Sequence, residues 1–235
     1  MWGKLIAATG VAIALPAAAY VASPYLNQAP LPDVPGCPRY IAVDQPLIAH
    51  GGGGLPEETY ANSLRAINLA AAHGFDLIEI DFMVHGDDIL IQHDSHPPSE
   101  LTVPELVEWL RHHPHISIVT DFKSDDPLYL DNLAGLKLLQ PIAGDMRSRF
   151  IPQIYKPDEL GPAIALGYPK PILTLYRTRE GREPIDAINA IDLRAVTMPV
   201  ERAHLADEIK HPVYLHTVNE PMPGFGLYTD CLIPK

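Results

Sequence analysis

Short apolar runs alternate with amphipathic stretches along this chain from about residue 46 onward. Residues 76–84 follow a period of two, which places the large apolar side chains on one face of a strand and Glu79 and Asp81 on the other. Residues 60–73 follow a helical period instead, and Gly74 is a common kind of helix stop. The domain therefore begins with alternating strands and helices.

The same alternation continues toward the C-terminus and predicts eight principal strands. Thr102 and Glu105 form a capping-box pattern with Pro104 between them, so a helix should begin there. Regular alternation of strands and helices favours parallel pairing, and eight such units close a barrel. The predicted strands cover residues 46–49, 76–84, 116–122, 150–155, 171–176, 194–199, 212–218 and 226–232, and further helices are expected at 130–142, 184–191 and 202–209 and after residue 156.

The predicted fold class is α/β: a compact (β/α)8 TIM barrel that occupies residues 41–235. Residues 89–92 form an extra short β-hairpin with the second strand. Residues 219–225 are too few for a full helix, so later crossovers are expected to be reduced to loops. Roughly 200 residues is at the low end for this fold.

Two segments precede the predicted barrel. Residues 1–22 contain one charge, Lys4, then an alanine-rich apolar run in which residues 17–19 resemble a signal-peptidase site. We expect a cleaved signal peptide or a retained N-terminal membrane anchor, with a buried structural helix as the third alternative. Residues 23–40 are proline-rich and are interpreted as a linker. The protein is accordingly expected to be exported, either periplasmic or secreted, or tethered to a membrane by the uncleaved segment.

The net charge of the chain argues against nucleic-acid partners. A net charge of −12 argues against nucleic-acid binding, which needs clustered Lys and Arg, and it disfavours electrostatic docking on an anionic membrane.

Cys37 and Cys231 are the two cysteines of the chain. An even count in an exported protein suggests a disulfide, and a closing barrel brings its two ends together. Two free buried thiols are the alternative.

Three acidic residues occur where predicted strands run out, and they suggest a metal site. Glu79 and Asp81 lie two apart on one strand, so their side chains point to the same side with Cα atoms about 6.6–7 Å apart. Asp121 ends the next principal strand, and barrel enzymes place their functional residues at such ends. Converging carboxylates need a cation between them, and an all-oxygen set favours one divalent cation, Mg²⁺ or Ca²⁺. The alternative is a surface strand whose carboxylates face water.

Two histidines and one lysine add candidate chemistry at the same strand ends. His50 and His93 could transfer protons in opposite directions, because histidine is the usual donor and acceptor near neutral pH. Lys123 could neutralise a phosphate, or it could pair with Asp121 instead. The glycine run at residues 51–54 could cradle a phosphate with its backbone amides, or it could form a tight loop that leaves room beside His50. Together these groups predict a metal-dependent phosphodiesterase.

Short motifs extend this pattern across the barrel: His50, Asn62-Ser63, Gly74, Glu79-Ile80-Asp81, Asp87-Asp88, His93-Asp94, Asp121-Phe122-Lys123, His216-Thr217-Val218-Asn219 and Tyr228-Thr229-Asp230. As a set they resemble the glycerophosphodiester phosphodiesterase family, within the wider group of phosphatidylinositol-phospholipase-C-like barrels. The resemblance implies acid and base roles for His50 and His93, and a metal site made of Glu79, Asp81 and Asp121. It implies substrate or phosphate contacts for Lys123, Gly51, Gly52 and Asn62. The implied substrate is a small-molecule or lipid-derived phosphodiester, most narrowly a glycerophosphodiester.

The chain departs from the family pattern at two positions beside this site. Gly51 stands where typical members have Arg, and Ala61 stands where they have Glu. The segment between His93 and the third principal strand is also shorter than usual. Phosphodiester chemistry is therefore better supported than a glycerol headgroup. Cleavage by water and cleavage through a cyclic phosphate both stay open. The alternative functions are phospholipase-like cleavage of a lipid headgroup and an inactive exported barrel that acts as a binding module.

Overall fold

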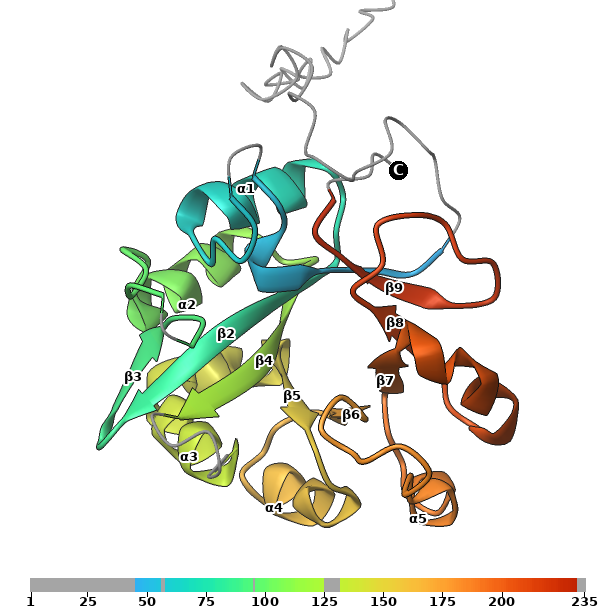
Figure 1. Cartoon of the computed structure of the whole chain (residues 1–235). Helices are drawn as coiled ribbons and strands as arrows, with labels where there is room; N and C mark the ends of the chain where they lie inside the picture. The colour runs from blue at the N-terminus through green and yellow to red at the C-terminus, as the bar shows by residue number, and fades with distance from the viewer. Residues whose placement is uncertain (1–44, 56–57, 95, 125–131, 232–235) are drawn as a thin grey trace, which may run out of the picture. The chain divides into compact units, whose positions relative to one another are not determined.

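The structure is a computed structural model that describes residues 45–55, 58–94, 96–124 and 132–231. Eight parallel strands form a closed barrel, because β1 pairs with both β2 and β9 (Figure 1). The predicted TIM barrel is therefore confirmed, as is the extra hairpin: β3 pairs antiparallel with β2 and lies outside the ring. The strands are β1 Leu47–Ala49, β2 Leu77–His85, β3 Asp88–Ile91, β4 Ser117–Ser124, β5 Phe150–Ile154, β6 Ile172–Thr174, β7 Ala195–Pro199, β8 Val213–His216 and β9 Gly226–Thr229.

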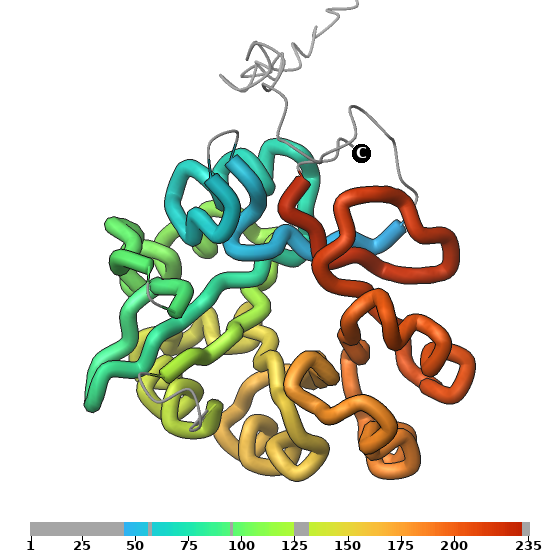
Figure 2. The backbone as a smooth tube through the Cα atoms, in the orientation of Figure 1, coloured from blue at the N-terminus to red at the C-terminus, as the bar shows by residue number. Residues whose placement is uncertain are grey.

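The helices lie outside the ring of strands, as the tube in Figure 2 also shows. The chain travels once round the barrel, so that its last strand returns beside its first. The α-helices are α1 Leu64–Ala72, α2 Val103–His112, α3 Asn132–Ala143, α4 Leu160–Ala165 and α5 Ile185–Asn189, and the 3-10 helices are η1 His50–Gly52, η2 Gly144–Arg149, η3 Pro157–Glu159 and η4 Val200–Glu208.

Local capping decides where the first helices begin. Thr102 and Glu105 make the predicted capping box in both directions, and α2 follows it. The helix expected at 60–73 starts later than predicted, at Leu64, because Ser63 accepts a hydrogen bond from the backbone of the first turn and is the N-cap. Residues 60–63 are therefore available to the site instead of being helical.

The crossovers shrink along the second half of the barrel, as predicted. The segment expected as a helix at 202–209 is instead the 3-10 helix η4, and none of its residues is buried. Helices in proteins are stabilised mainly by packing of an apolar face, and the apolar contact of η4 with the core is limited to the partly buried Ala203 and Leu205. The connection from β8 to β9 contains no helix in the described part of the chain.

Strand alternation separates two hydrophobic clusters. The interior of the barrel is filled by Ile48, Leu77, Val119, Ile151, Ile172, Ala195 and Tyr228. The larger cluster lies between the strands and the helices and includes Ile78, Ile80 and Phe82 of β2. The predicted two faces of β2 are thus confirmed, and Glu79 and Asp81 point toward the barrel interior, on the side of Leu77.

The N-terminal segments lie outside the described residues. This applies to the signal peptide or anchor predicted at 1–22, to the linker predicted at 23–40, and to Cys37. Within the described ranges, no helix has both the length and the apolar character needed to cross a bilayer.

Candidate active site

Three carboxylates converge inside the mouth of the barrel. Glu79 and Asp81 come from β2, and Asp121 comes from β4, where strand register places it level with Asp81. One oxygen of each carboxylate lies within 4.8 Å of the others, and the side chains are buried, with 1%, 1% and 7% exposure for Glu79, Asp81 and Asp121. The structure thus brings together all three predicted metal ligands and excludes the alternative of a solvated strand.

Burial raises the pKa of Glu79 well above its ordinary value, and the neighbouring carboxylates Asp81 and Asp121 raise it further. Burial also raises the pKa of Asp81, against the opposing effect of Lys123. The pKa of Asp121 is lowered despite its burial, because Lys123 and a hydrogen bond from Tyr155 favour its charged form. The raised pKa values of Glu79 and Asp81 mean that this cluster favours a bound proton or another cation among its carboxylates.

A divalent cation fits these residues. Glu79 Oε1 is buried and has no hydrogen-bond partner in the described part of the chain, whereas Glu79 Oε2 accepts a hydrogen bond of 2.7 Å from the Gly51 backbone N–H. A buried carboxylate oxygen without a partner is costly, and a cation would satisfy it. Three oxygen donors favour a hard ion such as Mg²⁺ or Ca²⁺.

Lys123 lies among the carboxylates. Its Nζ is 2.7 Å from Asp121 Oδ2 and 3.3 Å from Asp81 Oδ1, and these partners raise the pKa of Lys123 although its burial acts to lower it. Pairing with Asp121 was the sequence-based alternative to phosphate binding. In this structure the ammonium is engaged with that pair, and its contact with phosphate stays a prediction.

Asn62 and Gly51 support the carboxylates from the side of β1. Asn62 Nδ2 donates to Asp81 Oδ2 at 2.8 Å, and Asn62 Oδ1 accepts from the Asp81 backbone N–H at 3.0 Å. Gly51 has a φ of +55°, and a Cβ at this position would lie 2.7 Å from the Tyr60 Cα. No side chain can therefore project from position 51 without moving Tyr60. Phosphate contacts by Gly51, Gly52 and Asn62 stay predictions.

His50 has a carboxylate partner that sequence reasoning missed. Its Nδ1 lies 2.8 Å from Asp230 Oδ1, and Thr217 Oγ1 lies 3.4 Å from the same nitrogen. Asp230 follows β9, and the pairing of Ala49 with Thr229 makes the next residues of the two strands neighbours. The motif at the C-terminus was visible in the sequence, but its partner depends on barrel closure. A carboxylate at Nδ1 fixes the tautomer and leaves Nε2 to exchange protons.

Tyr60 lies between the two candidate catalytic histidines. The centroid of its ring is 4.7 Å from that of His50 and 4.5 Å from that of His93. Burial raises the pKa of Tyr60, as do the negative charges of Asp230 and Asp81, so its phenol stays protonated at neutral pH. His50 and His93 are thus held on two sides of one ring near the carboxylates. No pattern along the chain pointed to Tyr60 as a site residue, because it was included in the predicted helix.

His216 and Tyr155 are two more unpredicted residues of the same rim. Burial, and to a smaller extent the proximity of His50, lowers the pKa of His216 to about 4. Its Nδ1 lies 3.2 Å from Thr197 Oγ1, and its buried Nε2 has no hydrogen-bond partner among the described residues. Tyr155 donates a 2.6 Å hydrogen bond to Asp121 Oδ1. Both side chains are therefore uncharged at neutral pH beside a highly charged cluster.

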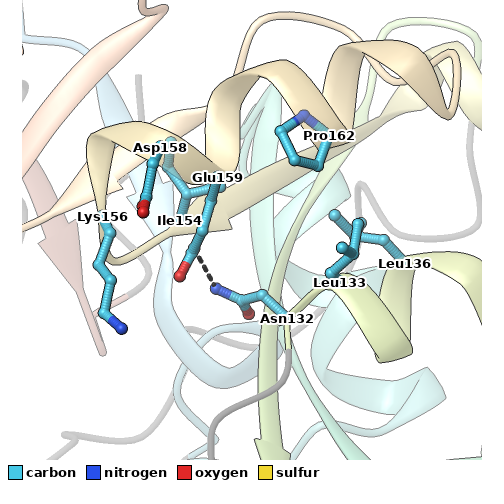
Figure 3. Close-up of a pocket in the computed structure, with 8 residues that line it drawn as sticks. All are labelled: Asn132, Leu133, Leu136, Ile154, Lys156, Asp158, Glu159 and Pro162. Atoms are coloured by element: carbon cyan, nitrogen blue, oxygen red, sulfur yellow. Dashed lines mark hydrogen bonds between the residues drawn. The ribbon is translucent and has the colours of Figure 1, made fainter.

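A separate pocket of about 240 Å³ lies between α3 and the η3–α4 segment (Figure 3). Its polar side is organised by Glu159, which accepts hydrogen bonds of 3.0 Å from Asn132 Nδ2 and from the Tyr155 backbone N–H. The pocket is lined by none of the three carboxylates. Its contact with the active site is indirect: Glu159 fixes the backbone of Tyr155, whose phenol contacts Asp121.

Cys231 is 1% exposed and disulfide-bonded. The other predicted partner, Cys37, lies outside the described residues, so the pairing of these two cysteines stays a prediction.

No protein-family model matches the sequence, and no curated protein matches it. Several solved structures do match the fold of this chain. A glycerophosphodiester phosphodiesterase from Thermotoga maritima has 16% sequence identity and a TM-score of 0.58, and the match covers 82% of this chain and 97% of that one. A glycerophosphodiester phosphodiesterase from Agrobacterium tumefaciens has 12% identity and a TM-score of 0.53, over 80% of this chain and 96% of that one. At these identities the likeness establishes the shared barrel fold.

Proposed function

We propose that this protein is a metal-dependent phosphodiesterase that hydrolyses a small-molecule or lipid-derived phosphodiester, most narrowly a glycerophosphodiester. The observation that carries the proposal is the group of three buried carboxylates, flanked by His50 and His93, in which one Glu79 oxygen has no partner within the described ranges. The names of the solved structures that share the fold support the same reaction.

Each histidine has a distinct role in the proposed reaction. The Nδ1–H of His50 donates a hydrogen bond to Asp230, so Nε2 of His50 can take a proton from the attacking hydroxyl or water. Asp230 also stabilises the imidazolium that forms, as a carboxylate partner does in other catalytic histidine pairs. His93, on the other side of Tyr60, donates a proton to the departing alkoxide.

Glu79, Asp81 and Asp121 would hold one divalent cation, Mg²⁺ or Ca²⁺. When bound, such a cation would polarise a phosphate oxygen as a Lewis acid. Lys123 contributes one fixed positive charge beside the same carboxylates. The second function that we consider, phospholipase-like cleavage of a lipid headgroup, would use the same residues and differs only in the alcohol. We place the reaction outside the cytoplasm, on the basis of the predicted signal peptide or anchor.

The test is turnover of bis(4-nitrophenyl) phosphate by the full chain, in chelator and with Mg²⁺ or Ca²⁺ restored. We expect activity that needs the cation and that falls about 10²–10⁴-fold in His93→Ala, the range for a lost general acid or base. His112→Ala is the matched control, because this histidine is exposed on α2 and pairs only with Glu108 in the described structure. Equal turnover in excess chelator would contradict the metal site, and no turnover at all would favour the binding-module alternative.

Substrate class is decided by comparing glycerophosphocholine with phospholipid vesicles of the same headgroup. Preferential release of choline or glycerol phosphate from the soluble diester supports the glycerophosphodiester assignment. Preferential cleavage of the vesicles would assign the phospholipase-like reaction.

A further inference from the structure

The loop after β6 presents a cation and an aromatic ring at the mouth of the barrel. Strand β6 ends at Thr174, and the chain then turns, with a 3.0 Å hydrogen bond from the Thr178 backbone N–H to the Leu175 carbonyl. Tyr176 is 66% exposed, which is unusual for so large a ring, and Arg177 beside it is exposed as well. Exposed aromatic and arginine side chains in one loop are typical of binding surfaces.

Arg177 is connected to the carboxylate cluster through one residue. Its Cζ lies 5.3 Å from the centroid of the Tyr155 ring, in a cation–π contact, and the phenol of Tyr155 donates to Asp121. The ring of Tyr176 packs edge-on against His216, with centroids 5.4 Å apart. The loop therefore faces the same rim as the proposed catalytic residues.

The loop is held in place by a second arginine from the next crossover. Arg202 Nη1 donates to the Leu175 carbonyl and Nη2 donates to the Thr178 carbonyl, each at 2.5 Å. Arg202 Nε lies 3.4 Å from Glu183 Oε1, and the Arg202 side chain is 12% exposed. One largely buried guanidinium thus fixes both ends of the turn that carries Tyr176 and Arg177. A binding group on such a fixed turn loses little freedom when ligand arrives.

The negative charge of the phosphodiester and of its transition state explains why a further positively charged side chain is needed at this loop. Lys123 is engaged with two carboxylates, and position 51 cannot carry a side chain while Tyr60 occupies the adjacent space. The cluster carries three carboxylates, which one divalent cation and Lys123 would together neutralise. A phosphodiester adds one negative charge, and its transition state adds a second. A guanidinium matches the geometry of phosphate oxygens and stays charged at any relevant pH.

We propose that Arg177 binds the phosphate of the substrate and that Arg202 is a positioning residue that holds the Arg177 loop in its binding conformation. The inference rests on the proposed phosphodiesterase function and adds the residue that recognises the scissile group. It assigns a role to the β6 loop that the motifs in the sequence do not indicate.

The first test compares Arg177→Ala with Arg179→Ala, a matched control that removes another exposed arginine from the same loop. Calorimetric titration with inorganic phosphate in the presence of Mg²⁺ should show affinity about 10- to 100-fold weaker for Arg177→Ala, the range for a lost hydrogen bond between charged groups. Arg177→Lys should recover part of the loss, and Arg179→Ala should bind like the wild type. The value of kcat/KM for bis(4-nitrophenyl) phosphate should fall in the same order.

The second test asks whether Arg202 acts through Arg177. Arg202→Ala should weaken phosphate binding, and adding Arg177→Ala to it should cause little further loss, because both changes remove the same interaction. Mg²⁺-induced thermal stabilisation should survive in both single variants, which separates a misplaced loop from a damaged barrel. Additive losses would overturn the positioning role.

The outcomes separate this inference from the proposed function. Wild-type turnover with equal phosphate affinity in Arg177→Ala and Arg179→Ala would overturn the inference and leave the function intact. A wild type without turnover would contradict the function, while the phosphate titration would still decide the role of Arg177. A wild type that binds no phosphate would overturn the inference.

Discussion

Replacing Glu79 with Gln should make the metal-free protein more stable and remove its response to metal. The substitution keeps the shape of the side chain and keeps an oxygen to accept the Gly51 N–H. It removes the negative charge that the structure leaves least compensated, because Glu79 Oε1 has no hydrogen-bond partner among the described residues. A buried ligand carboxylate is thus expected to be a liability until the cation binds.

The magnitude follows from the spacing of the carboxylates. Two unit charges 4.8 Å apart repel by about 3.5 kcal/mol at an effective dielectric constant of about 20. Glu79 faces two such charges, Asp81 and Asp121, and Lys123 offsets about one of them. Protonation of Glu79 relieves part of the remainder. We therefore expect Glu79→Gln to stabilise the metal-free protein by about 1–3 kcal/mol, within the range seen when buried ionic groups are replaced.

The assay is thermal or urea unfolding of both proteins at pH 7, with chelator and then with excess Mg²⁺ or Ca²⁺. At a cation concentration 100 times Kd, the wild type should gain about 2.7 kcal/mol. For a chain of this size that corresponds to a rise in Tm of about 5–10 °C. The variant should start higher and gain little. Glu180→Gln, which removes an exposed glutamate of the β6–α5 connection, should behave like the wild type in both conditions.

Two results would refute this reasoning. A variant that retains the full metal-induced rise in Tm would show that Glu79 is not a ligand. A variant that is less stable than the wild type in chelator would show that the Glu79 carboxylate is compensated by a partner that the structure does not show.

Four further predictions concern the histidines and the cysteines. Asp230→Asn should lower kcat about 10²–10⁴-fold at unchanged far-UV circular dichroism, because His50 loses the partner that fixes its tautomer; unchanged kcat would exclude that role. His93→Ala should matter less for a nitrophenolate leaving group than for an alkoxide, whereas His50→Ala should slow both alike; equal ratios would contradict the division of labour. The wild type should lose about 3 kcal/mol of unfolding free energy between pH 7 and pH 4, because the pKa of His216 is about 4 when folded and 6.5 when unfolded, so the unfolded state binds more protons as the pH falls. His216→Gln should remove this loss, and urea unfolding at the two pH values measures it. Free-thiol titration of the unreduced protein should find no reactive thiol; two would disprove the cysteine pairing.

The sequence predicted the features that depend on neighbouring residues. The period of two in β2 fixed which side chains face the barrel interior, and the structure confirms that Glu79 and Asp81 share the face of Leu77. The same local pattern located α2, because a capping box is contained in four residues. These features need no knowledge of which strands finally meet.

The missed features depend on contacts between distant parts of the chain. Asp230 meets His50 across 180 residues, and only the closure of β9 on β1 makes them neighbours. Arg202, in the crossover after β7, contacts the carbonyl of Leu175 in the crossover after β6. Tyr60 was missed for a different reason: its φ of +55° takes it out of the predicted helix, and hydrophobic period does not report such a conformation. The three predicted carboxylates thus converge as expected because strands carry them, whereas the contacts that the fold makes between loops were not predicted.

The distribution of unfavourable conformations argues against an inactive scaffold. Among the described residues, the non-glycine residues with positive φ are Tyr60, Asn62 and Asp94. Such conformations cost of order 1–3 kcal/mol each, least for Asn and Asp. All three lie beside the proposed site: Tyr60 between the histidines, Asn62 on Asp81, and Asp94 next to His93. Two of the buried polar atoms that lack a hydrogen-bond partner among the described residues, Glu79 Oε1 and His216 Nε2, lie on the same rim. A barrel needed only as a scaffold would be more stable with relaxed residues at the three positive-φ positions, so their location beside the proposed site favours a functional role for this mouth of the barrel.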